Sequence, residues 1–165
     1  MKPLTQPLRD EHKELIPHIE KILEVADSIS DASLEQIRDG VRQVYEFLTY
    51  HLIPHAQAED VALYPAVQKA LGSPDSTRTM SRDHVEVGLY IDELADLRRE
   101  LRPENFKALQ RVLYGLHALV KVHFAKEEEV YLPILEERLT VEEAREMFEA
   151  MERAAGRAKQ AAHAH

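Results

Sequence analysis

The chain has 165 residues and a formal net charge of -9, with 44% of its residues hydrophobic and 31% charged. These values indicate one soluble globular domain and exclude an intrinsically disordered chain. The negative charge argues against nucleic acid and acidic membrane surfaces as partners. The lack of cysteine excludes disulfides, iron–sulfur clusters and thiolate catalysis. We find no signal-peptide core and no apolar run of about 20 residues, so we expect a cytoplasmic protein.

Apolar residues recur every three or four positions along most of the chain, which predicts helices rather than strands. Short connections between them predict an all-α fold, an up-down-up-down antiparallel four-helix bundle. The expected helices cover about residues 7–29, 33–71, 78–101 and 103–138. The buried face of the fourth helix is expected to contain Leu116, Val120, Val130 and Ile134.

Two segments have the sequence of a capping box, which starts a helix. Ser33 with Gln36 opens the second helix, and Thr140 with Glu143 opens a short C-terminal fifth helix. This fifth helix is expected to fade after Gly156, which leaves the tail "AAHAH" frayed and its histidines without a role. The predicted organisation is a bundle over residues 1–139, followed by the helix and tail over 140–165.

The sequence also repeats itself. "HAQAE" at 55–59 is matched by "HFAKE" at 123–127, so a histidine precedes a glutamate by four positions in both halves. In the helices before them, "RDEHKEL" around His12 aligns with "SRDHVEV" around His84. Each half is therefore predicted to be a helical hairpin. Its first helix offers a histidine, and its second offers a histidine and a glutamate on one face.

Six side chains of this repeat fall on faces that must be buried in a bundle: His12, His55, Glu59, His84, His123 and Glu127. A single histidine on such a face is usually a core residue, and a single His–Glu pair usually lies on the surface. However, burying an unpaired carboxylate costs several kcal/mol, and no lysine or arginine shares these faces. A dinuclear metal site would compensate, since carboxylates can bridge two metals while neutral imidazoles bind each one.

The types of ligand narrow the choice of metal. The HExxH motif of zinc hydrolases and the ExxH motif of carboxylate-rich di-iron bundles are absent. Calcium and magnesium prefer oxygen ligands. Four imidazoles with two carboxylates suit iron best, and manganese or zinc less well.

The same segments resemble a known family. "EHKEL", "HAQAEDVALYP", "RDHVEV" and "HFAKEEEVYLP" are similar to the hemerythrin-like, HHE cation-binding domain family, over roughly residues 8–137. The resemblance implies a four-helix bundle with a non-haem di-iron centre, bridged by two carboxylates and an oxo or hydroxo group. It implies that one iron is held by His12 and His55, the other by His84 and His123, with Glu59 and Glu127 as bridges.

The chain departs from the oxygen-carrying members of that family at Gly88. Those carriers place a second histidine there, one turn after the histidine of the third helix. A missing imidazole leaves a coordination position open, which favours redox chemistry with hydrogen peroxide, oxygen or nitric oxide over reversible oxygen carriage. The carriers also use an acid five residues after the fourth-helix histidine. That position is Glu128 here, whereas Glu127 fits the internal repeat better.

Further side chains could complete or support the coordination: His18, His51, His117, Glu128, Tyr64 and Tyr131. Plain packing is the simpler interpretation of the three histidines and of the two tyrosines.

Two functions fit such a site. One is a di-iron oxidoreductase that consumes hydrogen peroxide or another small oxidant and takes electrons from an external donor. The other is a protein that binds or senses oxygen, nitric oxide or iron without turnover. A metal-free helical interaction protein would leave the two buried acids unexplained.

Overall fold

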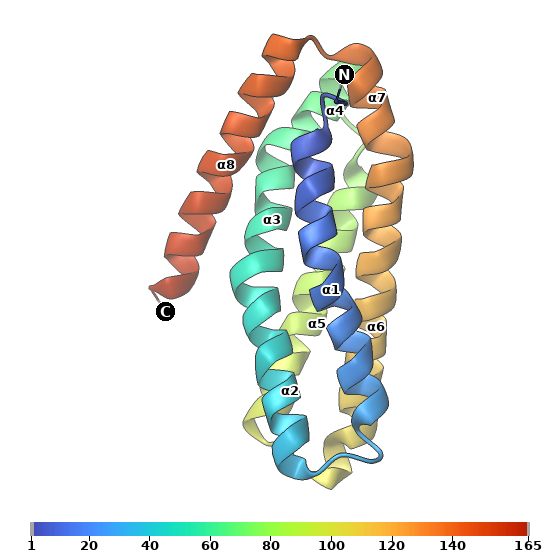
Figure 1. The fold of residues 1–165 in the computed structure, drawn as a ribbon, viewed down its shortest axis with the longest axis vertical. Coiled ribbons are helices and arrows are strands. Elements are labelled where there is room, and N and C mark those ends of the chain that lie inside the picture. The colour runs from blue at the N-terminus through green and yellow to red at the C-terminus, as the bar shows by residue number, and fades with distance from the viewer. Residues whose placement is uncertain (1, 165) are drawn as a thin grey trace.

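A computed structural model describes residues 2–164 of the chain. These residues contain helices and no strand, so the prediction of an all-α helical bundle is confirmed. The helices form four passages along the bundle, over residues 6–28, 34–71, 78–99 and 103–138, which are followed by a C-terminal helix. Figure 1 shows these passages side by side and the C-terminal helix against one side of the bundle. The α-helices are α1 (Gln6–Ser28), α2 (Leu34–Phe47), α3 (Ile53–Ala58), α4 (Tyr64–Leu71), α5 (Arg78–Arg99), α6 (Phe106–Lys126), α7 (Leu132–Arg138) and α8 (Val141–His163). A short 3-10 helix, η3 (Pro103–Asn105), precedes α6.

Both predicted capping boxes are present. The Ser33 hydroxyl accepts a 3.2 Å hydrogen bond from the Gln36 amide, and the Ser33 amide donates a 2.9 Å bond to the Gln36 side chain. Thr140 and Glu143 exchange the same pair of bonds at the start of α8. Each box satisfies backbone N–H groups that a helix start leaves without partners, and so fixes where α2 and α8 begin.

The second and fourth passages contain wider, π-helical turns, which the sequence did not predict. They are η1 (Leu48–Leu52), η2 (Glu59–Leu63) and η4 (Glu127–Tyr131), and in each the backbone N–H after the turn bonds to a carbonyl five residues back. A proline follows at the second position of the next helical segment, as Pro54, Pro65 and Pro133. Proline has no N–H to donate four residues back, and a wider turn lets the helix continue past it.

The π turn in the fourth passage changes which residues are buried after it. Val130 and Ile134 were expected on the buried face, but Val130 is 49% exposed and Ile134 is half-buried. Leu132 and Leu135 are fully buried instead. The prediction for Val130 was wrong because a π turn takes about one residue more than an α turn, which rotates the face that follows.

The core consists of two apolar clusters with polar side chains between them. Along α1 the first cluster contains Leu8 and the second contains Leu15, and His12 lies between them in the sequence. The same change of cluster occurs around His84, which lies between Met80 and Val87 on α5. Apolar packing on both sides therefore keeps bulk water from the polar layer.

The C-terminal helix is longer than expected. α8 has 23 residues and continues past Gly156 to His163, so the prediction of a short helix with a frayed tail was wrong. Met147 and Met151 of α8 are buried in the cluster that contains Leu8, and Figure 1 shows α8 alongside α3. This packing and the alanine-rich sequence maintain the helix. His165 lies outside the described residues.

The boundary predicted after residue 139 falls between α7 and α8, and the division of the chain into two parts stays a prediction. None of the helices within residues 2–164 combines the length and apolar character needed to cross a membrane.

Candidate metal centre

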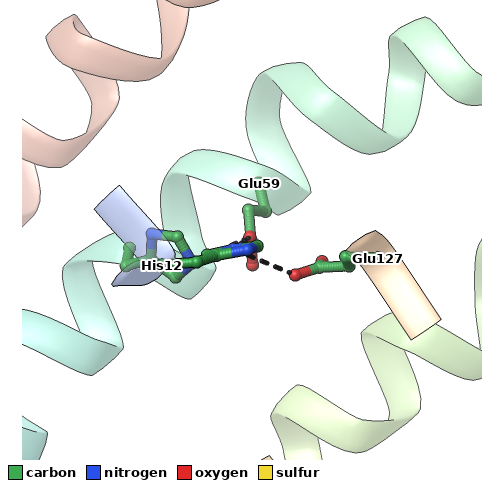
Figure 2. Close-up of side chains that lie close together, drawn as sticks. His12, Glu59 and Glu127 are labelled. Atoms are coloured by element: carbon green, nitrogen blue, oxygen red, sulfur yellow. Dashed lines mark ion pairs between the residues drawn. The ribbon is translucent and has the colours of Figure 1, made fainter. Parts of the chain in front are cut away.

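The structure brings all six side chains of the repeat together in the polar layer. They come from all four passages: His12 on α1, His55 on α3, Glu59 at the start of η2, His84 on α5, His123 on α6 and Glu127 at the start of η4. Figure 2 shows His12, Glu59 and Glu127 pointing toward one another. The Glu59 and Glu127 side chains have no exposed surface, and the His84 side chain is the most open, at 10%. The two acids are therefore fully buried within the bundle, and His84 is the member of the cluster with the largest exposed fraction.

One half of the cluster consists of His12, His55, Glu59 and Glu127, whose ligand atoms lie within 4.8 Å of one another. Glu59 Oε1 is 2.9 Å from His55 Nε2 and 3.7 Å from His12 Nε2. Glu127 Oε2 is 3.4 Å from the same His12 nitrogen. Two imidazole nitrogens and two carboxylate oxygens thus converge on one small volume.

The other half consists of Glu59, His84 and His123. The second oxygen of Glu59, Oε2, is 3.3 Å from His84 Nε2 and 3.9 Å from His123 Nε2. Glu127 also reaches this half, because its Oε1 is 3.3 Å from His123 Nε2. Each carboxylate therefore directs one oxygen to each pair of histidines.

Several of these buried atoms have no hydrogen-bond partner among the described residues: His12 Nε2, His55 Nε2, both oxygens of Glu59 and Oε2 of Glu127. Although His55 Nε2 and Glu59 Oε1 are only 2.9 Å apart, they are not aligned for a hydrogen bond. Buried polar atoms without partners are costly. Around His12 and His55 the donor atoms converge on a common point rather than pair with one another, which suits a cation, so the residues of this half fit a metal. In the other half His84 Nε2 and His123 Nε2 lie 3.0 Å apart, within hydrogen-bond distance of each other.

A second layer of carboxylates surrounds the four histidines, and the sequence analysis identified only Glu128 in it. The Nδ1 atom of each ring faces one acid: Glu128 at 2.8 Å from His12, Glu11 at 3.1 Å from His55, Asp60 at 2.8 Å from His84 and Asp83 at 2.9 Å from His123. An Nδ1–H directed at a carboxylate fixes the tautomer in which Nε2 carries the free lone pair, and increases the basicity of that nitrogen. The imidazoles of His12, His84 and His123 are therefore oriented to offer Nε2 to the interior. His55 Nδ1 lies close to Glu11 but is not aligned for a hydrogen bond with it.

The outer acids follow the internal repeat, which was the signal that could have identified them. Glu11 and Asp83 each directly precede the first-helix histidine of a half, and Asp60 and Glu128 each directly follow the buried glutamate. The acids before the histidines bind within their own half, whereas Asp60 and Glu128 bind the histidine of the other half. The two hairpins are thus joined by equivalent crossed contacts.

Comparison with known protein families identifies the family to which the chain belongs. The family model described as "Hemerythrin HHE cation binding domain" matches residues 4–135. The chain belongs to that family. Members of the hemerythrin HHE family bind metal ions, typically iron, and the buried histidines and glutamates of this member could hold one. Neither a curated protein nor a solved structure shows a significant match to the chain.

The charges within this HHE domain shift the pKa values of the cluster. Burial lowers the pKa of His12, but the carboxylates of Glu127 and Glu59 more than offset this and raise it to about 9. For the same reasons the pKa of His123 is about 10. Burial raises the pKa of Glu59, but the neighbouring histidines hold it well below its usual range. A cation that binds here must therefore displace protons from the imidazoles.

Besides the outer acids, Tyr64 of this HHE domain contacts the cluster directly. Its hydroxyl donates a 2.7 Å hydrogen bond to Glu127 Oε1 and lies 3.3 Å from His84 Nε2 and 3.2 Å from His123 Nε2. Its ring stacks on the His84 ring with centroids 5.5 Å apart. Burial and the charges of Glu59 and Glu127 raise the pKa of the phenol, so the hydroxyl keeps its proton in their presence.

The other candidates lie away from the cluster. His18 and His51 are exposed and stack on Phe47, with centroids 4.9 Å and 6.2 Å from its ring. His117 pairs with Glu20 at 3.3 Å. The Tyr131 hydroxyl donates to the backbone carbonyl of Ser76. These residues contribute to packing and surface contacts, as the simpler interpretation predicted.

Proposed function

We propose that the protein holds two iron ions and acts on a small oxidant such as hydrogen peroxide, oxygen or nitric oxide. In this proposal His12 and His55 bind one iron, and His84 and His123 bind the other. Glu59 and Glu127 lie between the two. Manganese and zinc suit this mixture of imidazole and carboxylate ligands less well.

The observation that carries the proposal is the orientation of Glu59. Its Oε1 faces His55 and His12, while its Oε2 faces His84, and neither oxygen has a hydrogen-bond partner. A carboxylate that bonded to a single cation or to a protein donor would not need both oxygens free and directed to opposite sides. This arrangement suits a carboxylate that bridges two cations.

Iron in this position would supply a change of oxidation state, which none of the protein's own side chains provides here. The outer acids hold the imidazoles of His12, His84 and His123 in the orientation that presents Nε2. The Tyr64 hydroxyl supplies a hydrogen-bond donor that holds Glu127 Oε1 in place. The two apolar clusters limit the entry of water, which would otherwise compete for the same donor atoms.

The limited exposure of the region around His84 is an argument for a small substrate. His84 has the most open of the six side chains, at 10%, and Gly88 follows it by one turn on α5. A Cβ added at Gly88 would meet no atom within 4 Å. No side chain at position 88 therefore covers this half of the cluster, and the small exposed fraction of His84 suits a diatomic molecule or peroxide.

The first test is the metal content of purified protein and of three variants. We expect the unchanged protein to bind two iron ions per chain, and Glu59→Ala and His123→Ala to lose most of the iron. His117→Ala is the matched control, because His117 is a half-buried histidine of α6 that pairs with Glu20 away from the cluster. Full iron content in both site variants would contradict the proposed ligands.

The second test separates turnover from binding. Absorption spectra of the iron-loaded protein are recorded without oxygen, after oxygen is added, and after it is removed again. Oxidation that persists, together with consumption of hydrogen peroxide, would support the proposed redox function. A spectral change that reverses when oxygen is removed would instead indicate a binding or sensing protein.

A further inference from the structure

A hollow of about 450 Å³ lies between α1 and α6, on the outer side of His12. We name it the α1/α6 hollow. Its walls come from residues three or four positions apart on each helix, including Lys13 and Ile16 of α1 and Lys121 and Ala125 of α6. A volume of this size is in the range that accommodates a small organic molecule.

Much of the surface of the hollow is apolar, with contributions from Phe124, Ile16 and Ile19. Phe124 lies on the His12 ring at a centroid distance of 4.3 Å and an interplanar angle of 18°. Ile16 stands at the side of the hollow with 47% of its surface exposed. Ala125 also lines the hollow, and its methyl side chain leaves this space unfilled. A flat apolar group could cover these surfaces and remove them from water.

The charges at the edge of the hollow leave one cation available. Arg9 is paired with Glu128 and Glu136, and the Lys121 ammonium lies 3.1 Å from Glu20. Lys13, in contrast, takes part in no ion pair with the described residues. The cations Arg9 and Lys121 are thus matched by carboxylates, and Lys13 is the cation of the hollow that has no carboxylate partner among the described residues. An anionic group could pair with Lys13 at little cost, whereas a cation would be repelled by it.

We propose that the α1/α6 hollow binds a small organic monoanion, with a flat apolar body against Phe124 and Ile16 and its anionic group near Lys13. The hollow shares His12 with the proposed metal centre, but the organic ligand would contact the outer side of this ring and not Nε2. The proposal does not depend on which metal is bound or on what the metal does.

The test uses two probes of equal size on the metal-loaded, full-length protein. 4-Phenylbutyrate has a flat apolar body and a carboxylate, and 4-phenylbutan-1-ol has the same body without the charge. We expect the carboxylate to bind at one site per chain in calorimetric titration, with a dissociation constant on the order of 1 mM. The alcohol should bind more weakly, by up to about fivefold, since an exposed ion pair is worth at most about that factor.

Two variants locate the binding site. Ala125→Leu fills the hollow with an apolar side chain and should abolish binding of both probes. Lys13→Gln should abolish the preference for the carboxylate while the alcohol still binds. Ala118→Leu and Lys107→Gln make the same changes at exposed positions of α6 outside the hollow and should have no effect. Circular dichroism verifies that every variant keeps its helices.

Three results would overturn the proposal. One is the lack of any binding of phenylbutyrate up to about 10 mM, which is well above the constant expected for a ligand of this size. The second is equal affinity for the acid and the alcohol. The third is binding that Ala125→Leu leaves unchanged, which would place the ligand elsewhere on the protein. Because calorimetry reports binding alone, each result is independent of the iron content and of any peroxide consumption.

Discussion

The Tyr64 hydroxyl donates a 2.7 Å hydrogen bond to Glu127 Oε1, and so connects the second helical passage with the fourth beside the candidate centre. Tyr64 follows Glu59 by five residues, on the far side of the π turn η2. The phenol therefore reaches the acid of the other half of the repeat, while the acid on its own passage directs its oxygens to the histidines.

We expect Tyr64→Phe to keep the fold and most of the iron but to change the iron spectrum and the reaction with oxidants. The phenyl ring can still stack on His84. The loss of the hydroxyl leaves the buried Glu127 oxygen without its donor, which should cost about 1–3 kcal/mol of unfolding free energy in metal-free protein. Loss of the hydrogen bond that positions Glu127 should slow oxidant consumption by about 10- to 100-fold, the usual effect of removing a partner of a metal ligand.

Denaturant unfolding and absorption spectra measure these effects. Tyr131→Phe is the control, because the Tyr131 hydroxyl donates to the Ser76 carbonyl and not to the cluster. A spectral change of the same size in both tyrosine variants would show that the Tyr64 hydroxyl has no particular role at the centre.

Glu128→Gln should weaken iron binding by about 10- to 100-fold, the usual effect of removing an acid behind a metal-binding histidine. Glu128 Oε1 lies 2.8 Å from His12 Nδ1. A neutral amide in its place would hold the tautomer of His12 less firmly and make Nε2 a weaker base. Competition with a chromophoric chelator measures the affinity. Glu129→Gln changes the exposed neighbouring acid and should leave the affinity as it is, so equal weakening in the two variants would contradict the assigned role.

The metal-free protein should lose stability as the pH rises above neutrality. In the folded state the pKa of His12 is about 9 and that of His123 about 10, both above the usual 6.5. Their stabilising contribution is therefore fully present below about pH 6.5 and disappears as the pH rises through these folded-state values, by a few kcal/mol in total. Denaturant unfolding of chelator-treated protein between about pH 6 and pH 10 measures the slope.

The affinity for iron should show the opposite pH dependence. Iron must displace the same protons from the imidazoles, so it should bind more tightly at high pH. A His12→Gln variant should show a flatter pH dependence in the metal-free state, whereas His117→Gln should keep the slope of the unchanged protein. If the metal-free protein were equally stable throughout this range, the protonated imidazoles would not be part of its folded state.

Gly88→His should slow the reaction with hydrogen peroxide. It would place an imidazole one turn after His84, where an added Cβ meets no atom within 4 Å, and this ring would compete with the incoming oxidant. Gly88→Ala is the control, because it adds no donor atom and should stabilise α5 by about 0.5–1 kcal/mol. Peroxide consumption at equal iron content measures the effect. Equal slowing by alanine and histidine would indicate steric blocking rather than competition for the metal.

The sequence predicted the elements that depend on local patterns. Ser33 and Thr140 begin helices as expected because a capping box needs only residues within four positions. His12 and Glu59 are buried as expected because they continue an apolar face. The assignment of each residue to a metal remains a prediction, since burial and proximity do not identify a bound ion.

Other features depended on packing that periodicity does not describe. Val130 was misplaced because the π turn at Glu127–Tyr131 rotates the helix by a fraction of a turn. The far end of α8 was expected to fray because the helix was judged without its contacts, although Met147 and Met151 anchor it. The contacts of Asp60 with His84 and of Asp83 with His123 were not predicted, because a charged residue next to a buried one in the sequence is normally assigned to the protein surface. Only the partner across the bundle gives it a role.

Because of the crossed contacts in the repeat, neither helical hairpin contains the complete set of residues of the candidate metal centre. The first provides His12, His55 and Glu59, the second provides His84, His123 and Glu127, and Asp60 and Glu128 each reach across to the opposite hairpin. A metal bound between them would act as a cross-link, and the covalent connection at residues 72–77 would become dispensable once it had formed. Both apolar clusters also join the two hairpins. A protein nicked in that loop should therefore remain one particle, and it should need more denaturant to separate into two fragments with iron bound than in the presence of a chelator.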